Sequence, residues 1–153
     1  MAVGTFQLFD STAKLTMGAG DLVANTIKCA LVTSSWTPDQ VNNNDWGDVS
    51  ANEIANGFGY STGGATLGSK VLTAVTKGFK FASANIQWTA SGGSIPAWRY
   101  AVFYVVGTID SVVNPLIGYF IGNDAPADIP ATIDGSPLNL NCPAGGWFTT
   151  TRP

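Results

Sequence analysis

The stretch "WRYAVFYVVG", residues 98–107, is almost continuous in bulky apolar side chains. From Tyr100 to Val106 every position except Ala101 carries a β-branched or aromatic residue. A short run of this composition is typical of a strand that is buried on both faces of its sheet. We therefore expect this segment to be a central strand, with other parts of the chain packed against both of its sides.

Further strands are predicted on both sides of this segment, and glycine-, proline-, asparagine- and aspartate-rich connectors separate them. The predicted strands are "NTIKCALVTSS" (25–35), "KVLTAVT" (70–76), "KFASANIQWTA" (80–90), "PLIGYFIG" (115–122) and "GWFTTTR" (146–152). Strands at this spacing in a chain of 153 residues indicate one domain. We predict a mainly β fold over residues 1–153, an antiparallel β-sandwich or jelly roll with one or two short helices.

Two short helices are expected. In "TFQLFDSTAKLTM" (5–17), apolar residues recur at spacings of three and four, which predicts an amphipathic helix. Ser50 and Glu53 have the spacing of a capping box, which predicts one helical turn at about 50–55 and gives Glu53 a structural role. The proline-rich stretch 122–145 is predicted to be a long, ordered loop or arm outside the core.

The composition argues against several partners. Only 11% of residues are charged, against about 25% in typical soluble domains, and the net charge is −3. The seven basic residues are scattered, so no cluster can neutralise a run of phosphates and nucleic-acid binding is not expected.

The longest purely apolar stretch, "AVFYVV" (101–106), is far below the ~20 residues of a membrane span. The start, "MAVGTFQLFD", lacks the features of a secretory signal. A weakly charged surface suits a protein packed against neighbours.

The chain offers little for catalysis. It contains no histidine, which excludes Ser–His and Cys–His nucleophiles and zinc sites built from Cys and His. The glycine-rich "GGATLGSK" (63–70) does not match the order of a phosphate-binding loop. We expect no enzymatic activity, no catalytic residues and no cofactor.

Two features keep alternatives open. The loop residues Asn42, Asn44, Asp45 and Asp48 could supply oxygen ligands to calcium, but they do not fit the EF-hand pattern and are more typical of Asx turns. Cys29 and Cys142 stand without a secretory signal, which favours free, buried thiols over a disulfide.

Aromatic residues divide between core and surface. Trp88, Trp98 and Trp147 lie on predicted strands and are expected in the core. Trp36 and Trp46 lie in or beside a polar loop, where they either fold back on that loop or contact a sugar or a protein partner. The segment "WGDVSANEIANGFGYSTGGATLGSK" (46–70) is interpreted as a structured loop that packs on a neighbouring subunit. Our candidate interface residues are Trp36, Trp46, Phe58, Tyr60, Thr62 and Leu67.

Several stretches together resemble a family of small virion structural proteins of tailed bacteriophages. The stretches are "NTIKCALVTSSWTPD", the segment 46–70, "ANIQWTASGGSIPAWRYAVFYV" and "PLIGY". In the second stretch the matching positions are Asp48, Glu53, Gly57, Gly59, Tyr60, Gly63, Gly64 and Leu67. In the third they are Trp88, Arg99, Tyr100, Ala101, Val102 and Tyr104. The resemblance covers roughly residues 20–121, and the stretch from 122 onward matches less well.

The resemblance implies a β-rich capsid decoration or cement protein in the virion. Such a protein binds the outer surface of the head, and its partners are the major capsid protein and further copies of itself. No catalytic residues carry over. Two alternatives stay open: a neck, tail or fibre component of the particle, and a sugar-binding β-sandwich that would use Trp36 and Trp46.

Overall fold

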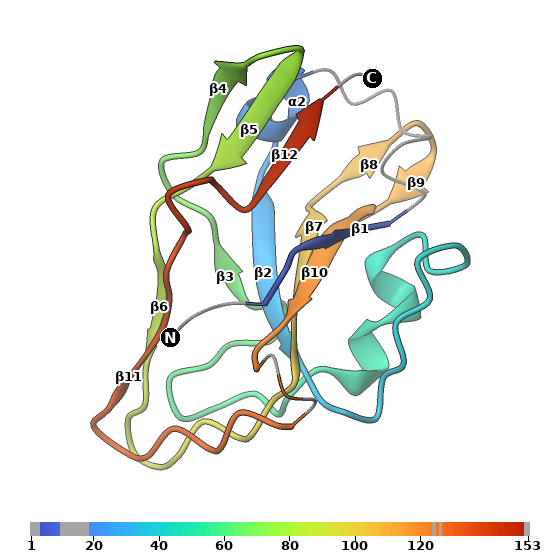
Figure 1. Cartoon of the computed structure of the whole chain (residues 1–153). Helices are drawn as coiled ribbons and strands as arrows, with labels where there is room; N and C mark the ends of the chain where they lie inside the picture. The colour runs from blue at the N-terminus through green and yellow to red at the C-terminus, as the bar shows by residue number, and fades with distance from the viewer. Residues whose placement is uncertain (1–3, 10–18, 124, 126, 152–153) are drawn as a thin grey trace.

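A computed structural model describes residues 4–9, 19–123, 125 and 127–151, and it confirms a mainly β fold (Figure 1). Every ladder between the described strands is antiparallel. The strands are β1 (Gln7–Leu8), β2 (Ile27–Val32), β3 (Ala65–Thr66), β4 (Val71–Val75), β5 (Gly78–Ala82), β6 (Ile86–Thr89), β7 (Tyr100–Val105), β8 (Thr108–Ile109), β9 (Val112–Val113), β10 (Leu116–Ile121), β11 (Pro137–Leu140) and β12 (Phe148–Thr151). The short helices are α2 (Ala19–Ala24), η1 (Trp46–Asp48) and η2 (Ser50–Asn52). None of the helices in these described ranges is long and apolar enough to cross a membrane.

Strand β7 is the centre of a five-stranded sheet with the order β1-β10-β7-β2-β3. It pairs with β10 on one side and with β2 on the other, so that Tyr104 stands between Leu116 and Lys28. All of its residues from Ala101 to Val105 are buried. The prediction of a central strand covered on both faces is confirmed.

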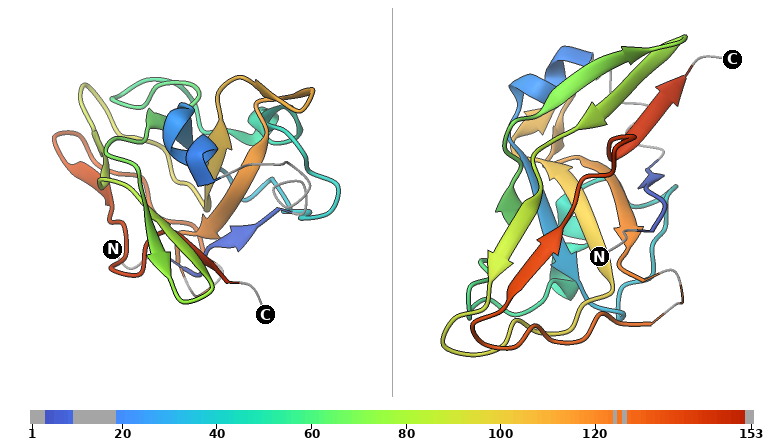
Figure 2. Two further views of the ribbon diagram at one scale, coloured as in Figure 1. Left: turned by 90° about the horizontal axis from the view of Figure 1, so that it is seen from above. Right: turned by 60° about the vertical axis from the view of Figure 1, so that its left-hand side comes forward.

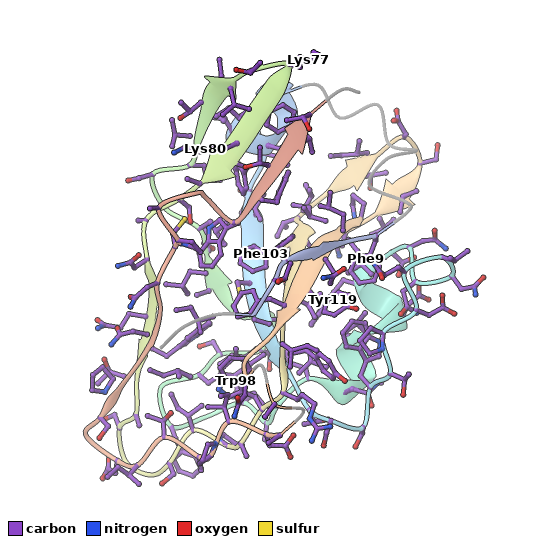
Figure 3. The ribbon with its side chains drawn as sticks, viewed as in Figure 1. Phe9, Lys77, Lys80, Trp98, Phe103 and Tyr119 are labelled. Carbon is purple, nitrogen blue, oxygen red and sulfur yellow. The ribbon has the colours of Figure 1, made fainter. Side chains whose placement is uncertain are left out.

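The two faces of this sheet carry two separate clusters of buried side chains. Along β7, Phe103 belongs to the first cluster, whereas Val102 and Tyr104 belong to the second. The first face is covered by a second layer, made of the sheet β12-β5-β4 and the pair β11-β6 (Figure 2, right). The second face is covered by residues 33–52 with η1 and η2, beside Phe9 and Tyr119 in Figure 3. Alternation along the strands thus gives a sheet with apolar contacts on both sides.

The predicted helix at 5–17 is wrong where the structure describes it. Residues 7–8 form β1, which pairs with Gly118 and Tyr119 of β10; positions 10–18 lie outside the described residues. Phe6 packs against Phe103, and Phe9 packs against Trp36 in the other cluster. Residues three apart on an extended chain point to opposite faces, so a spacing that suggests a helix serves a strand here.

The predicted capping box at Ser50 is also wrong. Helix η2 follows Val49, which makes no side-chain cap, whereas Asp45 and Asp48 form a capping box around η1. Glu53 follows η2 with an extended backbone, at φ −61° and ψ 147°. The Glu53 carboxylate accepts from the Tyr60 hydroxyl and the Gly63 amide instead of the Ser50 amide.

The proline-rich stretch 122–145 contributes to the core, contrary to the prediction. Strand β11 pairs with β6, and its Leu138 and Leu140 are buried. Pro137 is the first residue of that strand. Proline has no amide proton to donate to a strand ladder, and it is tolerated at this first position. The predicted strand at 80–90 is broken at 83–85 into β5 and β6, which belong to different sheets.

Candidate interaction surface

Three loops meet at one end of the molecule, at the bottom of Figure 1, and we call this region the loop end. It comprises residues 56–64, 91–97 and 127–136. The Ser91 amide donates to the Phe58 carbonyl at 3.2 Å, and the Gly92 amide donates to Asp134 Oδ1 at 2.9 Å. A β-bridge joins Ile95 to Thr132. Hydrogen bonds therefore tie all three loops into one surface.

Phe58 sits at the tip of a tight turn in the first loop. The amides of Gly57 and Tyr60 donate to each other's carbonyls at 2.8 and 3.0 Å. The turn places Phe58 at φ +55° and Gly59 at φ +93°. The left-handed region is uncommon for a bulky residue and costs free energy. The surrounding hydrogen bonds hold Phe58 there, with 50% of the residue exposed.

The neighbouring loop fixes the orientation of the Phe58 ring. A Cβ built on Gly93 would lie 2.4 Å from Phe58 Cδ1, so the ring rests directly on the backbone of a glycine. Gly59 lies even closer to the end of β6, since a Cβ built on it would lie 1.9 Å from the Thr89 carbonyl oxygen. Glycine at both positions lets the ring lie against the protein while its outer side stays exposed.

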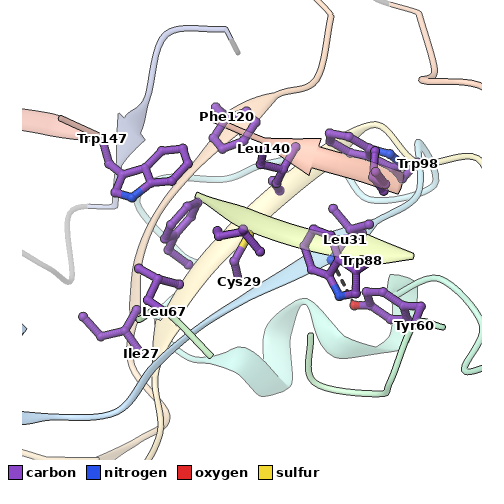
Figure 4. Close-up of a cluster of buried hydrophobic side chains, with 14 of the residues drawn as sticks. Ile27, Cys29, Leu31, Tyr60, Leu67, Trp88, Trp98, Phe120, Leu140 and Trp147 are labelled. Carbon is purple, nitrogen blue, oxygen red and sulfur yellow. Dashed lines mark hydrogen bonds between the residues drawn. The ribbon is translucent and has the colours of Figure 1, made fainter. Parts of the chain in front are cut away.

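A buried hydrogen-bond network supports this turn from below. Tyr60, which is 1% exposed, donates its hydroxyl proton to Glu53 Oε1 at 2.7 Å. The same hydroxyl accepts from the Leu31 amide at 3.0 Å (Figure 4). The Gly63 amide also donates to Glu53 Oε1, at 2.6 Å. Burial raises the pKa of the Tyr60 hydroxyl, and the hydrogen bond to Glu53 adds to this. Glu53 therefore acts as a structural acceptor for two donors of the segment 46–70.

Tyr104 of β7 anchors the same segment. Its hydroxyl donates to the Gly63 carbonyl at 2.8 Å, and its ring stacks on Trp46 with 4.6 Å between centroids and 6° between planes. Burial raises the pKa of Tyr104 to about 12, with Glu53 as a further cause. Gly64, at φ +77°, lies so close to β2 that its Cβ would be 1.9 Å from the Cys29 carbonyl oxygen. This close approach is to a strand of the same chain, and packing of the segment 46–70 on a neighbouring subunit stays a prediction.

The structure divides the candidate interface residues into two groups. Trp36, Tyr60 and Leu67 are buried in the core, so the expectation that they face a partner is wrong. Trp36 is covered because residues 33–52 fold back over the second face of the sheet, which the polar composition of that loop did not indicate. Phe58 and Thr62 are exposed, and Trp46 is half-buried with one face on Tyr104.

Sequence reasoning missed the contribution of the third loop. Ile133 is 68% exposed, the largest value among the big apolar residues of the described chain. Arg99 Nε pairs with Asp128 Oδ1 at 2.8 Å, and this ion pair holds the beginning of the loop next to the first residue of β7. The sequence predicts a loop or an arm here, and its composition alone does not distinguish a projecting arm from a loop packed on the protein.

The polar loop 39–48 consists of Asx turns, as its composition favoured. Asp39 Oδ1 accepts from the amides of Val41 and Asn42, and Asp45 Oδ1 accepts from the Gly47 amide. Asp48 Oδ2 instead accepts from the preceding amides of Asn44 and Asp45, at the capping box of η1. Hydrogen bonds, above all from the Asn42 side chain, hold the pKa of Asp39 below its ordinary value. Within the described residues no group of three His, Cys, Asp or Glu side chains could hold a metal ion.

Both cysteines are free thiols, as predicted. Cys29 is completely buried between β7 and β3, and burial raises the pKa of its thiol. Cys142 is only half-buried, so the expectation of burial holds for Cys29 alone.

The loop end combines a fixed backbone, an exposed aromatic ring and small polar side chains. Such a surface can bind another molecule through shape and apolar contact. Comparisons with models of protein families, with curated proteins and with solved structures gave no match.

Proposed function

We propose that this protein is a bacteriophage virion structural protein without enzymatic activity, and that it decorates the capsid. In this role it binds the outer surface of the head as repeated copies and stabilises the lattice of the major capsid protein. The observation that carries the proposal is the half-exposed Phe58, held on a left-handed turn over Gly93. Phe58 is therefore both ordered and exposed, as an aromatic anchor at a protein interface would be.

The residues that carry the resemblance to phage virion proteins support this proposal. Glu53, Tyr60 and Gly63 form the network beneath Phe58. Gly59 and Gly64 permit the close approaches that set the path of the loop. The motif therefore has a clear physical purpose, which is to fix the shape of an exposed segment. An anchor that is ordered before binding loses little entropy on binding.

The surface composition agrees with a protein that works in many copies. With 11% charged residues, the chain has little electrostatic repulsion between neighbours. Many weak contacts on a repeating lattice add up through avidity, so each single contact can be modest. A position at the neck, the tail or a fibre remains the second proposal, because the same anchor serves any of these assemblies.

The sugar-binding alternative is weakened by the positions of its two tryptophans. Trp36 is 4% exposed and belongs to the core, and Trp46 already stacks on Tyr104. A sugar site needs accessible aromatic faces, and this pair does not offer two of them.

Immunogold labelling of purified virions with an antibody to this protein tests the proposal. Label distributed over the head supports decoration. Label confined to one vertex or to the tail contradicts decoration and favours a neck or tail component. Particles without any label contradict a role in the virion.

A binding assay on particles that lack the protein tests the role of Phe58. Phe58→Ser is expected to weaken binding by roughly tenfold or more, as at other aromatic anchors. Val41→Ser is the matched control, because Val41 is also exposed, at 58%, but lies in the polar loop away from the loop end. Equal binding by both variants would exclude Phe58 as the anchor.

A further inference from the structure

The end of the molecule opposite the loop end carries an apolar hollow. It lies under the β4–β5 hairpin, has a volume of about 710 Å³, and is open to solvent. Figures 1 and 2 show this hairpin projecting at the far end of the molecule from the loops around residues 56–64. The lining side chains include Leu72, Ala74, Val75, Lys77, Phe79 and Thr150.

Strand register explains why this hollow is apolar. In the sheet β12-β5-β4, Phe81 stands opposite Leu72, and Phe79 stands opposite Ala74. Side chains two apart share a face, so all four point to the side of the core. Phe81 is fully buried there, but Phe79 lies nearer the hairpin tip and is only half-buried, and Ala74 is exposed. The tip of the β4–β5 hairpin therefore extends beyond the buried core, and its inner face is open to solvent there.

The charges at the two ends are complementary. Lys77 is exposed at the hairpin turn and lines the hollow, and Lys80 follows on β5 (Figure 3). At the loop end, Asp134 is exposed and accepts from Gly92, beside the loop on which Phe58 rests. The other carboxylate of the loop end, Asp128, is paired with Arg99, which precedes β7. One exposed carboxylate at the loop end, Asp134, thus matches one exposed ammonium group at the hollow, Lys77.

We propose that Phe58 of one copy inserts into the hollow under the β4–β5 hairpin of the next copy. Asp134 then faces Lys77 across the contact. Because the inserting residue and the receiving hollow lie at opposite ends of one chain, the contact is heterologous and runs head to tail. Copies joined in this way form a closed ring if the rotation between them closes, and an open row if it does not. The inference rests on the proposed function in one respect, which is the use of Phe58 as a protein anchor.

Two variants separate the inserting residue from the hollow. Phe58→Ser removes the anchor and leaves the hollow intact, whereas Ala74→Arg fills the hollow and leaves the anchor intact. Ala74 is exposed on β4, so the longer side chain does not disturb the buried core. Sedimentation velocity measures the association of each purified protein over a range of concentrations. Circular dichroism verifies that both variants keep the wild-type fold.

A head-to-tail contact predicts an unusual mixing result. The wild-type protein and Val41→Ser form oligomers, and each of the two variants alone is monomeric. An equimolar mixture of Phe58→Ser and Ala74→Arg forms a dimer and stops there, because only one intact anchor and one intact hollow remain. Monomeric wild-type protein at every concentration, or folded variants that do not pair when mixed, would overturn the proposal.

Charge reversal provides a second test of the pairing. Lys77→Glu is expected to weaken self-association by roughly tenfold or more, and Asp134→Lys in the same chain is expected to restore it. Lys80→Glu is the control, because Lys80 Nζ donates to the Ala144 carbonyl instead and Lys80 is not among the lining residues. If Lys77→Glu associates like the wild type, Lys77 does not face Asp134 and the proposal is wrong.

Failure of this inference and failure of the proposed function give different results. Label on the phage head together with a monomeric protein in solution contradicts self-association but keeps the decoration role. Head-to-tail oligomers together with unlabelled particles contradict the virion role but keep the contact.

Discussion

Tyr60 and Glu53 form a buried hydrogen bond in which the tyrosine hydroxyl donates to Glu53 Oε1 at 2.7 Å. The same hydroxyl accepts from the Leu31 amide, so it links the edge of β2 to the segment that presents Phe58. Tyr60→Phe is expected to lower the free energy of unfolding by about 1–3 kcal/mol, because it leaves a buried amide without its acceptor. Chemical denaturation followed by tryptophan fluorescence measures this change.

Tyr100→Phe is the matched control for Tyr60→Phe. Tyr100 is half-buried, and its hydroxyl makes no hydrogen bond to the residues that the structure describes. We expect a change of less than about 0.5 kcal/mol for this control. Equal losses for the two variants would mean that the Tyr60 hydroxyl contributes nothing specific.

Gly64→Ala is expected to be among the most damaging single changes. The added Cβ would lie 1.9 Å from the Cys29 carbonyl oxygen, and φ +77° is unfavourable for alanine. Both effects act on backbone that cannot move without separating β3 from β2, so we expect a loss of about 3 kcal/mol or more. Gly68→Ala serves as the control, since nothing lies within 4 Å of its Cβ. A thermal melt of both variants gives the comparison, and similar melting temperatures would contradict the close approach.

Alkaline pH is expected to destabilise the fold through Tyr104. Burial raises the pKa of Tyr104 from its ordinary 10.0 to about 12 in the folded protein. Between these values the unfolded chain has lost its proton and the folded chain keeps it, so the free energy of unfolding falls as the pH rises. The contribution is complete below pH 10.0 and is lost as the pH rises toward 12.

Denaturation midpoints measured across this pH range test the prediction, with Tyr104→Phe as the comparison. The variant is expected to be less stable at neutral pH, because the Gly63 carbonyl loses its donor. It is also expected to lose less stability than the wild type at high pH. Parallel pH profiles for the two proteins would show that Tyr104 does not control the alkaline response.

The two thiols are expected to differ in reactivity. Cys29 is fully buried with a raised pKa, whereas Cys142 is half-buried next to the loop before β12. A thiolate is the reactive species, so a neutral alkylating reagent should modify Cys142 and spare Cys29 in the native protein. Intact mass spectrometry should give one adduct in the native state and two after denaturation. Rapid double labelling of the native protein would indicate that the sheet around Cys29 opens.

The predictable part of the fold is the part whose strands are buried on both faces. The segments β2, β7 and β10 stand out in the sequence because both of their faces contact apolar clusters, which leaves few polar positions. Strand β11 was missed because its four residues include Pro137 and Asn139, and only Leu138 and Leu140 point to the core. Its strand character depends on the partner β6, which is remote in the sequence.

The sequence predicts where the candidate site lies, but it does not predict which residues of that segment are exposed. The glycine and aromatic pattern of 46–70 indicated a structured loop, and Phe58 and Thr62 are exposed there. The same pattern does not tell which aromatic residue faces inward. Phe58 is exposed because it lies in the centre of the turn that Gly57 and Tyr60 close, whereas Tyr60 follows the turn and is buried. Close approaches to Thr89 and Gly93 accompany that turn.

Phe6 and Phe148 stack with 5.5 Å between their ring centroids, although 142 positions separate them (148 − 6 = 142). Phe6 also packs on Phe103, at the centre of the sheet. During synthesis the ribosome must therefore release Phe148 before the covering of Phe103 is complete. Until then the nascent chain exposes aromatic surface that the finished protein hides, and chaperones that hold apolar segments have their greatest opportunity to bind it at this stage.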